Sequence, residues 1–128
     1  MATQYKVVAI VDDDPGMRKA MAILLSAFGY RTEQFSSGKA FLDAATKSEA
    51  TCLVVDIQLG DISGLEMGRQ LVAAGCKLPI IFMTACDDET IHSQAMEFGC
   101  VAYLLKPFSA KLLVEAIVKA IGHIPTDG

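Results

Sequence analysis

Five strand-like runs alternate with amphipathic stretches along the chain, and this alternation constrains the fold more than any other feature. The runs lie at 7–11, 31–35, 52–56, 79–84 and 102–105, and 31–35 is the most polar. Short, nearly all-apolar runs are typical of strands buried on both faces. The intervening stretches predict helices at 15–28, from 37 or 38 to about 47, and at 63–74, 88–98 and 109–121. Since parallel strands need crossovers of this length, we expect an α/β fold: a five-stranded parallel sheet with helices on both faces.

The predicted helix ends carry the residues that such ends require. Asp14 can accept hydrogen bonds from the first helical N–H groups, and Pro15 suits the first helical position. Asp87, Asp88 and Glu89 are expected to form the acidic first turn of the fourth helix. Glycines stand one step past four of the helical patterns, where a left-handed residue ends a helix without steric cost: Gly29, Gly75, Gly99 and Gly122.

Length and charge bound the protein class. A chain of 128 residues suits one domain, with a core at about 6–121 and a loose tail or linker stub at 122–128. The net charge of −4 argues against direct nucleic-acid binding and against attraction to anionic membranes. No apolar stretch approaches the roughly 18–20 residues of a membrane span, and no signal peptide is apparent, so we expect a cytoplasmic protein. The four cysteines form no CxxC pair and are expected to be reduced thiols.

Polar residues gather where the predicted strands end. The aspartates 12–14 follow the first strand, Asp56 ends the third, Thr84 ends the fourth and Lys106 follows the fifth. The carboxyl ends of parallel strands meet at one edge of a sheet, where open α/β folds bind ligands. These side chains are therefore expected to surround one crevice.

The chemistry of this set favours a phosphoryl group. Clustered carboxylates repel one another unless a cation offsets them, and Mg²⁺ prefers oxygen ligands. Lys106 would add a positive charge and Thr84 a hydroxyl donor, while a carboxylate can itself act as the nucleophile. Together they predict a Mg²⁺-dependent pocket for a phosphoryl group.

At this point the chain resembles the receiver domains of two-component response regulators. The matching features span about 6–121 and are Val11-Asp12-Asp13, Asp56, Ser63-Gly64, Thr84-Ala85 and Lys106-Pro107-Phe108. Their joint spacing makes the resemblance specific. It implies a flavodoxin-like, doubly wound sheet with strand order 2-1-3-4-5 and five helices.

The resemblance also implies roles at the acidic pocket. Asp56 would accept a phosphoryl group from a sensor histidine kinase or a histidine phosphotransfer protein. Asp13, Asp56 and the backbone carbonyl of Gln58 would bind Mg²⁺, and Asp12 would act on the metal through water. The protein would then be a self-catalysed phosphoacceptor and not an enzyme with a separate substrate.

Further roles follow from the same resemblance. Thr84, Ala85 and Lys106 would bind the phosphoryl group, and Thr84 and Tyr103 would switch the surface of the fourth helix, fifth strand and fifth helix. Gln58 and Cys86 would tune hydrolysis of the acyl phosphate; since neither is charged, we predict no unusually fast self-hydrolysis. The switched surface would act on an unknown output partner or an effector domain outside this chain, or form a phosphorylation-dependent homodimer.

Departures and alternatives remain at this stage. The family usually has proline four residues after the phosphoacceptor, where this chain has Gly60, and the isomer of the Lys106–Pro107 peptide is open. One alternative is a phosphatase of the haloacid-dehalogenase type, which also uses an aspartate nucleophile, a lysine and Mg²⁺. Another is a binding module that keeps the fold without the chemistry. His92 and His123 have no partner motif and are expected at the surface.

Overall fold

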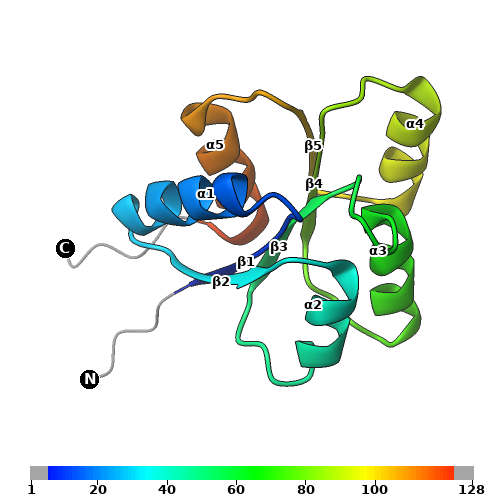
Figure 1. Cartoon of the computed structure of the whole chain (residues 1–128), viewed down its shortest axis with the longest axis horizontal. Helices are drawn as coiled ribbons and strands as arrows, with labels where there is room; N and C mark the ends of the chain where they lie inside the picture. Colours follow the sequence, from blue (N-terminus) through cyan, green and yellow to red (C-terminus); the bar gives the residue numbers. More distant parts are fainter. Residues whose placement is uncertain (1–5, 123–128) are drawn as a thin grey trace.

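All five strands run parallel in one sheet, in the order β2-β1-β3-β4-β5. The computed structural model describes residues 6–122. The strands are β1 (Val7–Val11), β2 (Arg31–Phe35), β3 (Cys52–Asp56), β4 (Ile80–Thr84) and β5 (Ala102–Leu105). The helices are α1 (Pro15–Ala27), α2 (Gly38–Ala44), α3 (Gly64–Ala73), α4 (Glu89–Phe98) and α5 (Ala110–Ile121) (Figure 1). The predicted fold class and strand order are confirmed.

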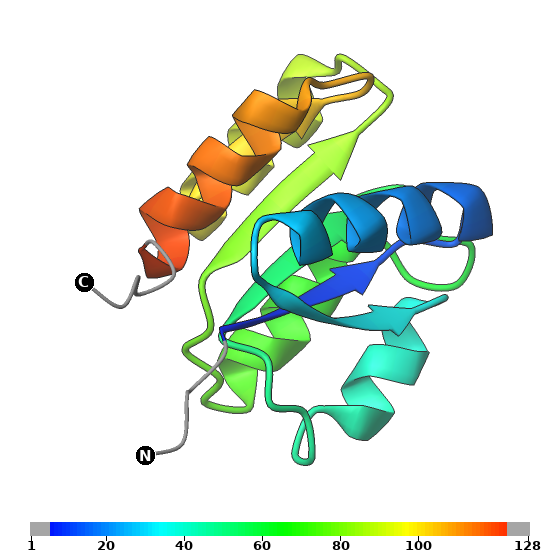
Figure 2. The ribbon, with the colours of Figure 1, turned by 90° about the vertical axis from the view of Figure 1, so that its left-hand side faces the viewer.

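Helices cover both faces of the sheet. Helices α1 and α5 lie together on one face, and α2, α3 and α4 lie on the other (Figure 1). In Figure 2 the arrowheads of β1, β2 and β4 point to the same end of the molecule. The sheet therefore has one carboxyl edge, which carries the loops into α1, α3 and α5.

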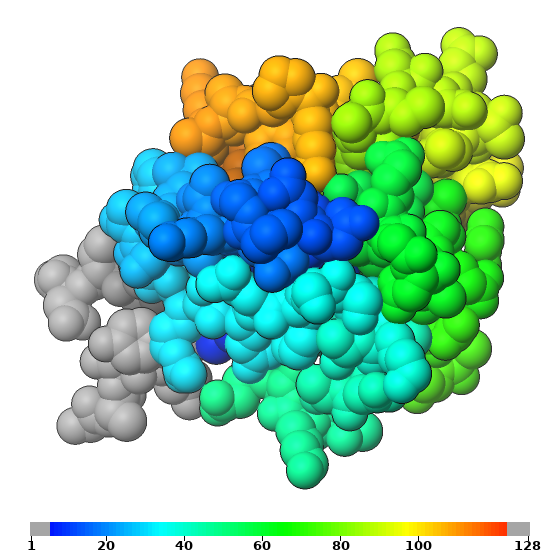
Figure 3. Space-filling model, viewed as in Figure 1, coloured from blue at the N-terminus to red at the C-terminus, as the bar shows by residue number. Residues whose placement is uncertain are grey.

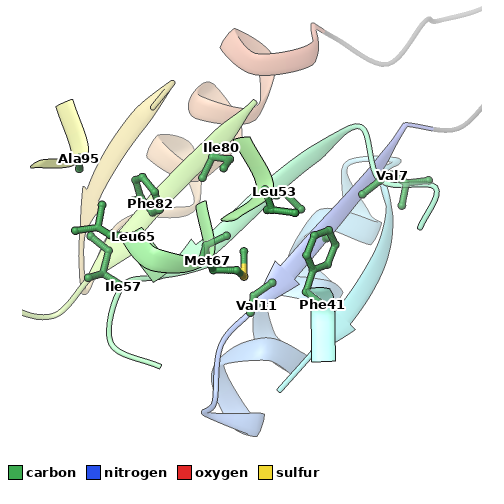
Figure 4. Packing of buried hydrophobic residues seen from close by; sticks show 14 residues of the cluster. Val7, Val11, Phe41, Leu53, Ile57, Leu65, Met67, Ile80, Phe82 and Ala95 are labelled. Atoms are coloured by element: carbon green, nitrogen blue, oxygen red, sulfur yellow. The ribbon is translucent and has the colours of Figure 1, made fainter. Parts of the chain in front are cut away.

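Successive residues of each central strand enter different cores. In β1, Val7, Ala9 and Val11 pack under α2, α3 and α4, while Val8 and Ile10 pack under α1 and α5. Figure 4 shows the first of these clusters, in which Phe41 of α2 and Met67 of α3 lie against the strands. This alternation explains why the central runs are apolar on both faces, as the sequence indicated.

The helix ends follow the sequence signals with small differences. The Asp14 side chain accepts hydrogen bonds from the N–H groups of residues 16 and 17, as predicted for a cap. Asp88 also caps a helix, so of the expected acidic first turn of α4 only Glu89 belongs to it. Helix α2 ends at Ala44, three residues earlier than predicted. All four predicted glycines adopt positive φ angles, between 81° and 93°.

Two further expectations meet the structure at its limits. Of the predicted tail at 122–128, residues 123–128 lie outside the described residues, as does His123. Within residues 6–122, no helix has the length and apolar character needed to cross a membrane.

Candidate functional site

Asp12, Asp56 and Lys106 form a hydrogen-bonded network at the carboxyl edge of the sheet. The Lys106 Nζ donates to Asp12 Oδ2 at 2.9 Å and to Asp56 Oδ2 at 2.8 Å. Both carboxylates are buried, with 0% and 5% of their residue surface exposed, and the lysine side chain is 18% exposed. The segment after β1, the end of β3 and the segment after β5 thus supply one acid–lysine network. Figure 3 shows the segments after β1 (dark blue), β3 (green) and β5 (orange) meeting on one face.

Backbone groups fix the two acids further. Asp12 Oδ1 accepts from the N–H of Asp14 at 2.9 Å, and Asp56 Oδ1 accepts from the N–H of Gln58 at 2.8 Å. The guanidinium of Arg18 on α1 donates to the backbone carbonyl of Asp12 at 2.6 Å. Both carboxylates are therefore held on each oxygen, and their orientation is set by the turns that follow β1 and β3.

The network carries more negative than positive charge, and the pKa directions reflect it. Burial raises the pKa of Asp56 above its ordinary value; the Asp12 charge adds to the rise, while hydrogen bonds from Lys106 and Gln58 oppose it. Burial lowers the pKa of Lys106, but the hydrogen bonds and charges of Asp56 and Asp12 outweigh it and raise the pKa overall. The two carboxylates beside Lys106 favour retention of the proton on its ammonium. A further cation would relieve this excess.

Asp13 completes a set of oxygen ligands. It is exposed, and one carboxylate oxygen each from Asp12, Asp13 and Asp56 can be chosen so that all three lie within 4.8 Å of one another. An all-oxygen donor set of carboxylates, open to solvent at Asp13, suits Mg²⁺, which binds through one or two carboxylates and keeps several waters. The predicted metal residues Asp12, Asp13 and Asp56 are thus brought together, and Gln58 follows directly in the β3–α3 loop.

A second group of contacts surrounds Thr84 at the end of β4. Its side chain is buried, and its hydroxyl Oγ1 donates to Gln58 Oε1 at 2.7 Å. The N–H of Cys86 donates to the same Oγ1 at 3.1 Å. Ala85 and Cys86 are exposed at the start of the β4–α4 loop. The two residues proposed from the resemblance to tune hydrolysis therefore both contact Thr84.

Tyr103 lies beside this loop on β5. Its ring stacks on His92 of α4, with centroids 4.5 Å apart and 15° between the planes. Among the described residues, its hydroxyl is buried and has no hydrogen-bond partner. Burial raises the pKa of Tyr103, and the nearby Asp87 charge adds to the rise. His92 is exposed, as expected, but it has a partner that the sequence did not suggest.

Close backbone packing positions the β3–α3 loop. A Cβ on Gly64 would lie 2.5 Å from the backbone oxygen of Asp56, so only glycine lets α3 begin this close to β3. Asp61 in the same loop accepts from the N–H groups of Gly38 and Lys39 at the start of α2. A Cβ on Gly60 would meet Asp13 Oδ2 at 3.5 Å, an ordinary contact. The loop is thus held where α3 begins and through Asp61, although it lacks the usual proline. The Lys106–Pro107 peptide, open from sequence, is cis.

Comparison with known proteins defines the family. The model of the response regulator receiver domain matches residues 8–118. The chain is 34% identical over 121 residues to the transcriptional regulatory protein FixJ of Azorhizobium caulinodans, covering 94% of this chain and 57% of that protein. It is 34% identical to the response regulator protein TodT of Pseudomonas putida, and the match covers 98% of this chain and 55% of that protein. A crystal structure of FixJ-N superposes with a TM-score of 0.86 at 33% sequence identity. The superposition covers 97% of this chain and 99% of that one.

The chain belongs to the family of response regulator receiver domains. It spans a little over half the length of the curated relatives named above. The predicted family is confirmed. Sequence reasoning missed the side-chain contacts of Gln58 with Thr84 and of His92 with Tyr103, because no periodicity or motif pairs these positions.

Proposed function

We propose that this domain accepts a phosphoryl group on Asp56 from a phosphohistidine of a sensor histidine kinase or a histidine phosphotransfer protein. The observation that carries the proposal is the acid–lysine network beside Asp13: a nearly buried carboxylate between an ammonium and a set of oxygen ligands. An Asp56 oxygen would attack phosphorus as the N–P bond to the donor imidazole breaks. An acyl phosphate and a free imidazole result. The proposed reaction would take place in the cytoplasm, where a donor of this class would act.

Asp13, Asp56 and the Gln58 carbonyl would hold Mg²⁺, and Asp12 would act on it through water. When bound, the ion would neutralise charge on the transferring phosphoryl oxygens. Lys106 reaches Asp56 Oδ2 directly, so its ammonium is placed to pair with a phosphoryl oxygen on that side. The domain would catalyse only its own phosphorylation and dephosphorylation. The Lys106 ammonium, together with a cation held by the acids, would orient the incoming phosphoryl group without a separate substrate pocket.

The phosphoryl group on Asp56 would change the positions of Thr84 and Tyr103. Thr84 would turn its hydroxyl to the phosphoryl group together with the N–H of Ala85, and Tyr103 would take up the space released. The surface of α4, β5 and α5 would then differ between the two states, which biases binding of an output partner, an effector domain outside this chain, or a second copy. FixJ and TodT are named as regulators, which supports an output of this kind.

Incubation with acetyl phosphate, with and without Mg²⁺, tests the chemistry by intact mass. We expect one phosphoryl group to be gained only with Mg²⁺, and none in the Asp56→Asn variant. Asp43→Asn changes an exposed aspartate of α2 that pairs with Lys39 and serves as the matched control. It should gain the group like the parent protein.

Two results would contradict the proposal. Phosphorylation of Asp56→Asn at the parental rate would move the acceptor elsewhere. An absence of any adduct, together with an absence of Mg²⁺ binding by calorimetry, would mean that the domain acts as a binding module without phosphoryl chemistry.

A further inference from the structure

The hydroxyl of Thr84 is already committed to a partner in this structure. It lies at the buried end of β4, with none of the residue surface exposed, and Gln58 Oε1 accepts from it at 2.7 Å. The other acceptor in reach is the Cys86 carbonyl at 3.4 Å. The Cys86 N–H meanwhile donates to the hydroxyl oxygen at 3.1 Å. Both the proton and a lone pair of this hydroxyl are therefore in use.

A hydroxyl has one proton to donate. If Thr84 donates it to a phosphoryl oxygen on Asp56, the bond to Gln58 Oε1 must break. The two bonds are mutually exclusive, so the stability of the first opposes formation of the second. The Gln58 amide is exposed and regains water when it is released, whereas the buried Thr84 hydroxyl needs a new acceptor.

Gln58 is also tied to the phosphoacceptor itself. Its backbone N–H donates to Asp56 Oδ1 at 2.8 Å while its side chain holds Thr84, which lies 26 residues further along the chain. A single residue thus connects the acid at the end of β3 with the hydroxyl at the end of β4. This arrangement keeps the side chain within reach of Thr84 as long as the turn after Asp56 is intact.

We propose that Gln58 is a positioning residue that holds Thr84 in the unphosphorylated arrangement and so weakens binding of a phosphoryl group at Asp56. This inference rests on the proposed function and goes beyond it. It differs from tuning of hydrolysis, because it acts on how tightly the phosphoryl group is held in place and requires no attacking water.

Beryllofluoride tests the proposal, since it binds at aspartate as a phosphoryl mimic that does not turn over. Its affinity is measured by calorimetry in saturating Mg²⁺ for the parent and for Gln58→Met and Gln58→Leu. These exposed substitutions remove the acceptor and keep the backbone N–H. A neutral hydrogen bond of ordinary net strength predicts affinity tighter by roughly 2- to 10-fold. Gln70→Met is the matched control. Gln70 is exposed on α3, its side chain hydrogen-bonds only to Glu66 among the described residues, and its substitution should leave the affinity unchanged.

A double-mutant comparison separates the hydrogen bond from other effects of residue 58. Thr84→Val removes the hydroxyl, so in that background Gln58→Met should no longer tighten beryllofluoride binding. The Cys86 amide offers a second readout. Its hydrogen exchange, followed by NMR without Mg²⁺, should speed up in Gln58→Met, because the hydroxyl that it donates to is less firmly held.

The outcomes distinguish the two proposals. If the parent binds beryllofluoride but both Gln58 variants bind equally or more weakly, the positioning role is wrong and the phosphoacceptor function stands. The positioning role is likewise wrong if Gln58→Met tightens binding as much in Thr84→Val as in the parent. If the parent neither binds beryllofluoride nor gains a phosphoryl group, both proposals fail.

Discussion

The carboxyl edge of the sheet contains two regions that are held in different ways. On one side, the acid–lysine network of Asp12, Asp56 and Lys106 is closed by charged hydrogen bonds of 2.8–2.9 Å and by backbone N–H groups. On the other side, the hydroxyl of Thr84 has one close side-chain acceptor, and among the described residues the hydroxyl of Tyr103 has none. The first region, the acid–lysine network, consists of buried charged groups in a fixed frame. The second, which we call the hydroxyl region, consists of the neutral side chains of Thr84 and Tyr103 beside an exposed loop.

This difference suits the proposed roles of the two regions, in which the network binds the phosphoryl group and the side chains of Thr84 and Tyr103 change position. Charged hydrogen bonds are roughly twice as strong as neutral ones, and breaking one member of a buried pair costs several kcal/mol. A neutral hydroxyl bond contributes about 1 kcal/mol, which binding of one dianion can exceed. The network can therefore keep its geometry while the hydroxyl region changes. Substitutions in either region test this contrast.

Lys106→Met is expected to have the largest effect. It leaves the buried Asp12 and nearly buried Asp56 carboxylates without their shared cation, which should cost about 3 kcal/mol of unfolding free energy. Urea unfolding without Mg²⁺ measures it, and added Mg²⁺ should reduce the loss because it supplies positive charge to the same acids. Lys39→Met removes an exposed lysine paired with Asp43 and should change stability by under about 0.5 kcal/mol. Equal losses in the two variants would show that the network is not a fixed frame.

Gly64→Ala should have the next largest effect, because it disturbs the frame through the backbone. The new Cβ would lie 2.5 Å from the Asp56 backbone oxygen, and relieving this overlap should cost about 2 kcal/mol. Thermal unfolding measures the loss. Gly60→Ala lies in the same loop, meets only an ordinary contact with Asp13 and should stay within about 0.5 kcal/mol of the parent. If Gly64→Ala were as stable as Gly60→Ala, the close approach of α3 to β3 would not require glycine at position 64.

Tyr103→Phe should have the smallest effect and the opposite sign. It removes a buried hydroxyl that is unpaired among the described residues and keeps the ring that stacks on His92. We expect a gain of about 1 kcal/mol in urea unfolding. Tyr30→Phe is the comparison, since the Tyr30 hydroxyl has an acceptor in the Gly122 carbonyl at 3.5 Å and should bring no gain. A loss of stability in Tyr103→Phe would mean that this hydroxyl is bonded in solution and that the second region is as firmly held as the first.

The contrast also separates what the sequence could predict from what it could not. The limits of β1, β2, β3 and β5 agree with the predicted strand-like runs, because each run ends at a polar residue or a turn. The convergence of Asp12, Asp56 and Lys106 followed from their places at strand ends, which topology alone brings to one edge. The strand order came from the resemblance to receiver domains and not from the pattern.

The contacts of Thr84 and Tyr103 could not be predicted from the sequence, for a physical reason. The bond between Gln58 and Thr84 depends on the rotamer of an exposed amide in a loop, and no repeat links two positions 26 residues apart. The sequence predicts His92 to be a surface residue, and the side chain is exposed on α4. Its ring stack with Tyr103 depends on how α4 packs against β5, which the sequence does not show. Helix α2 ended early because residues 45–47 form a turn in place of a last helical turn.

The acid–lysine network has a consequence for the order in which the protein acquires its chemistry during synthesis. Lys106 lies 50 residues after Asp56 and 94 after Asp12 in the chain. A growing chain that has exposed both acids but not yet Lys106 lacks the ammonium, and bringing residues so far apart in the chain together costs loop-closure entropy. Under the proposed function, reactivity at Asp56 would therefore arise late and would require the whole domain. A partly synthesised or locally unfolded copy would lack the complete acid–lysine network.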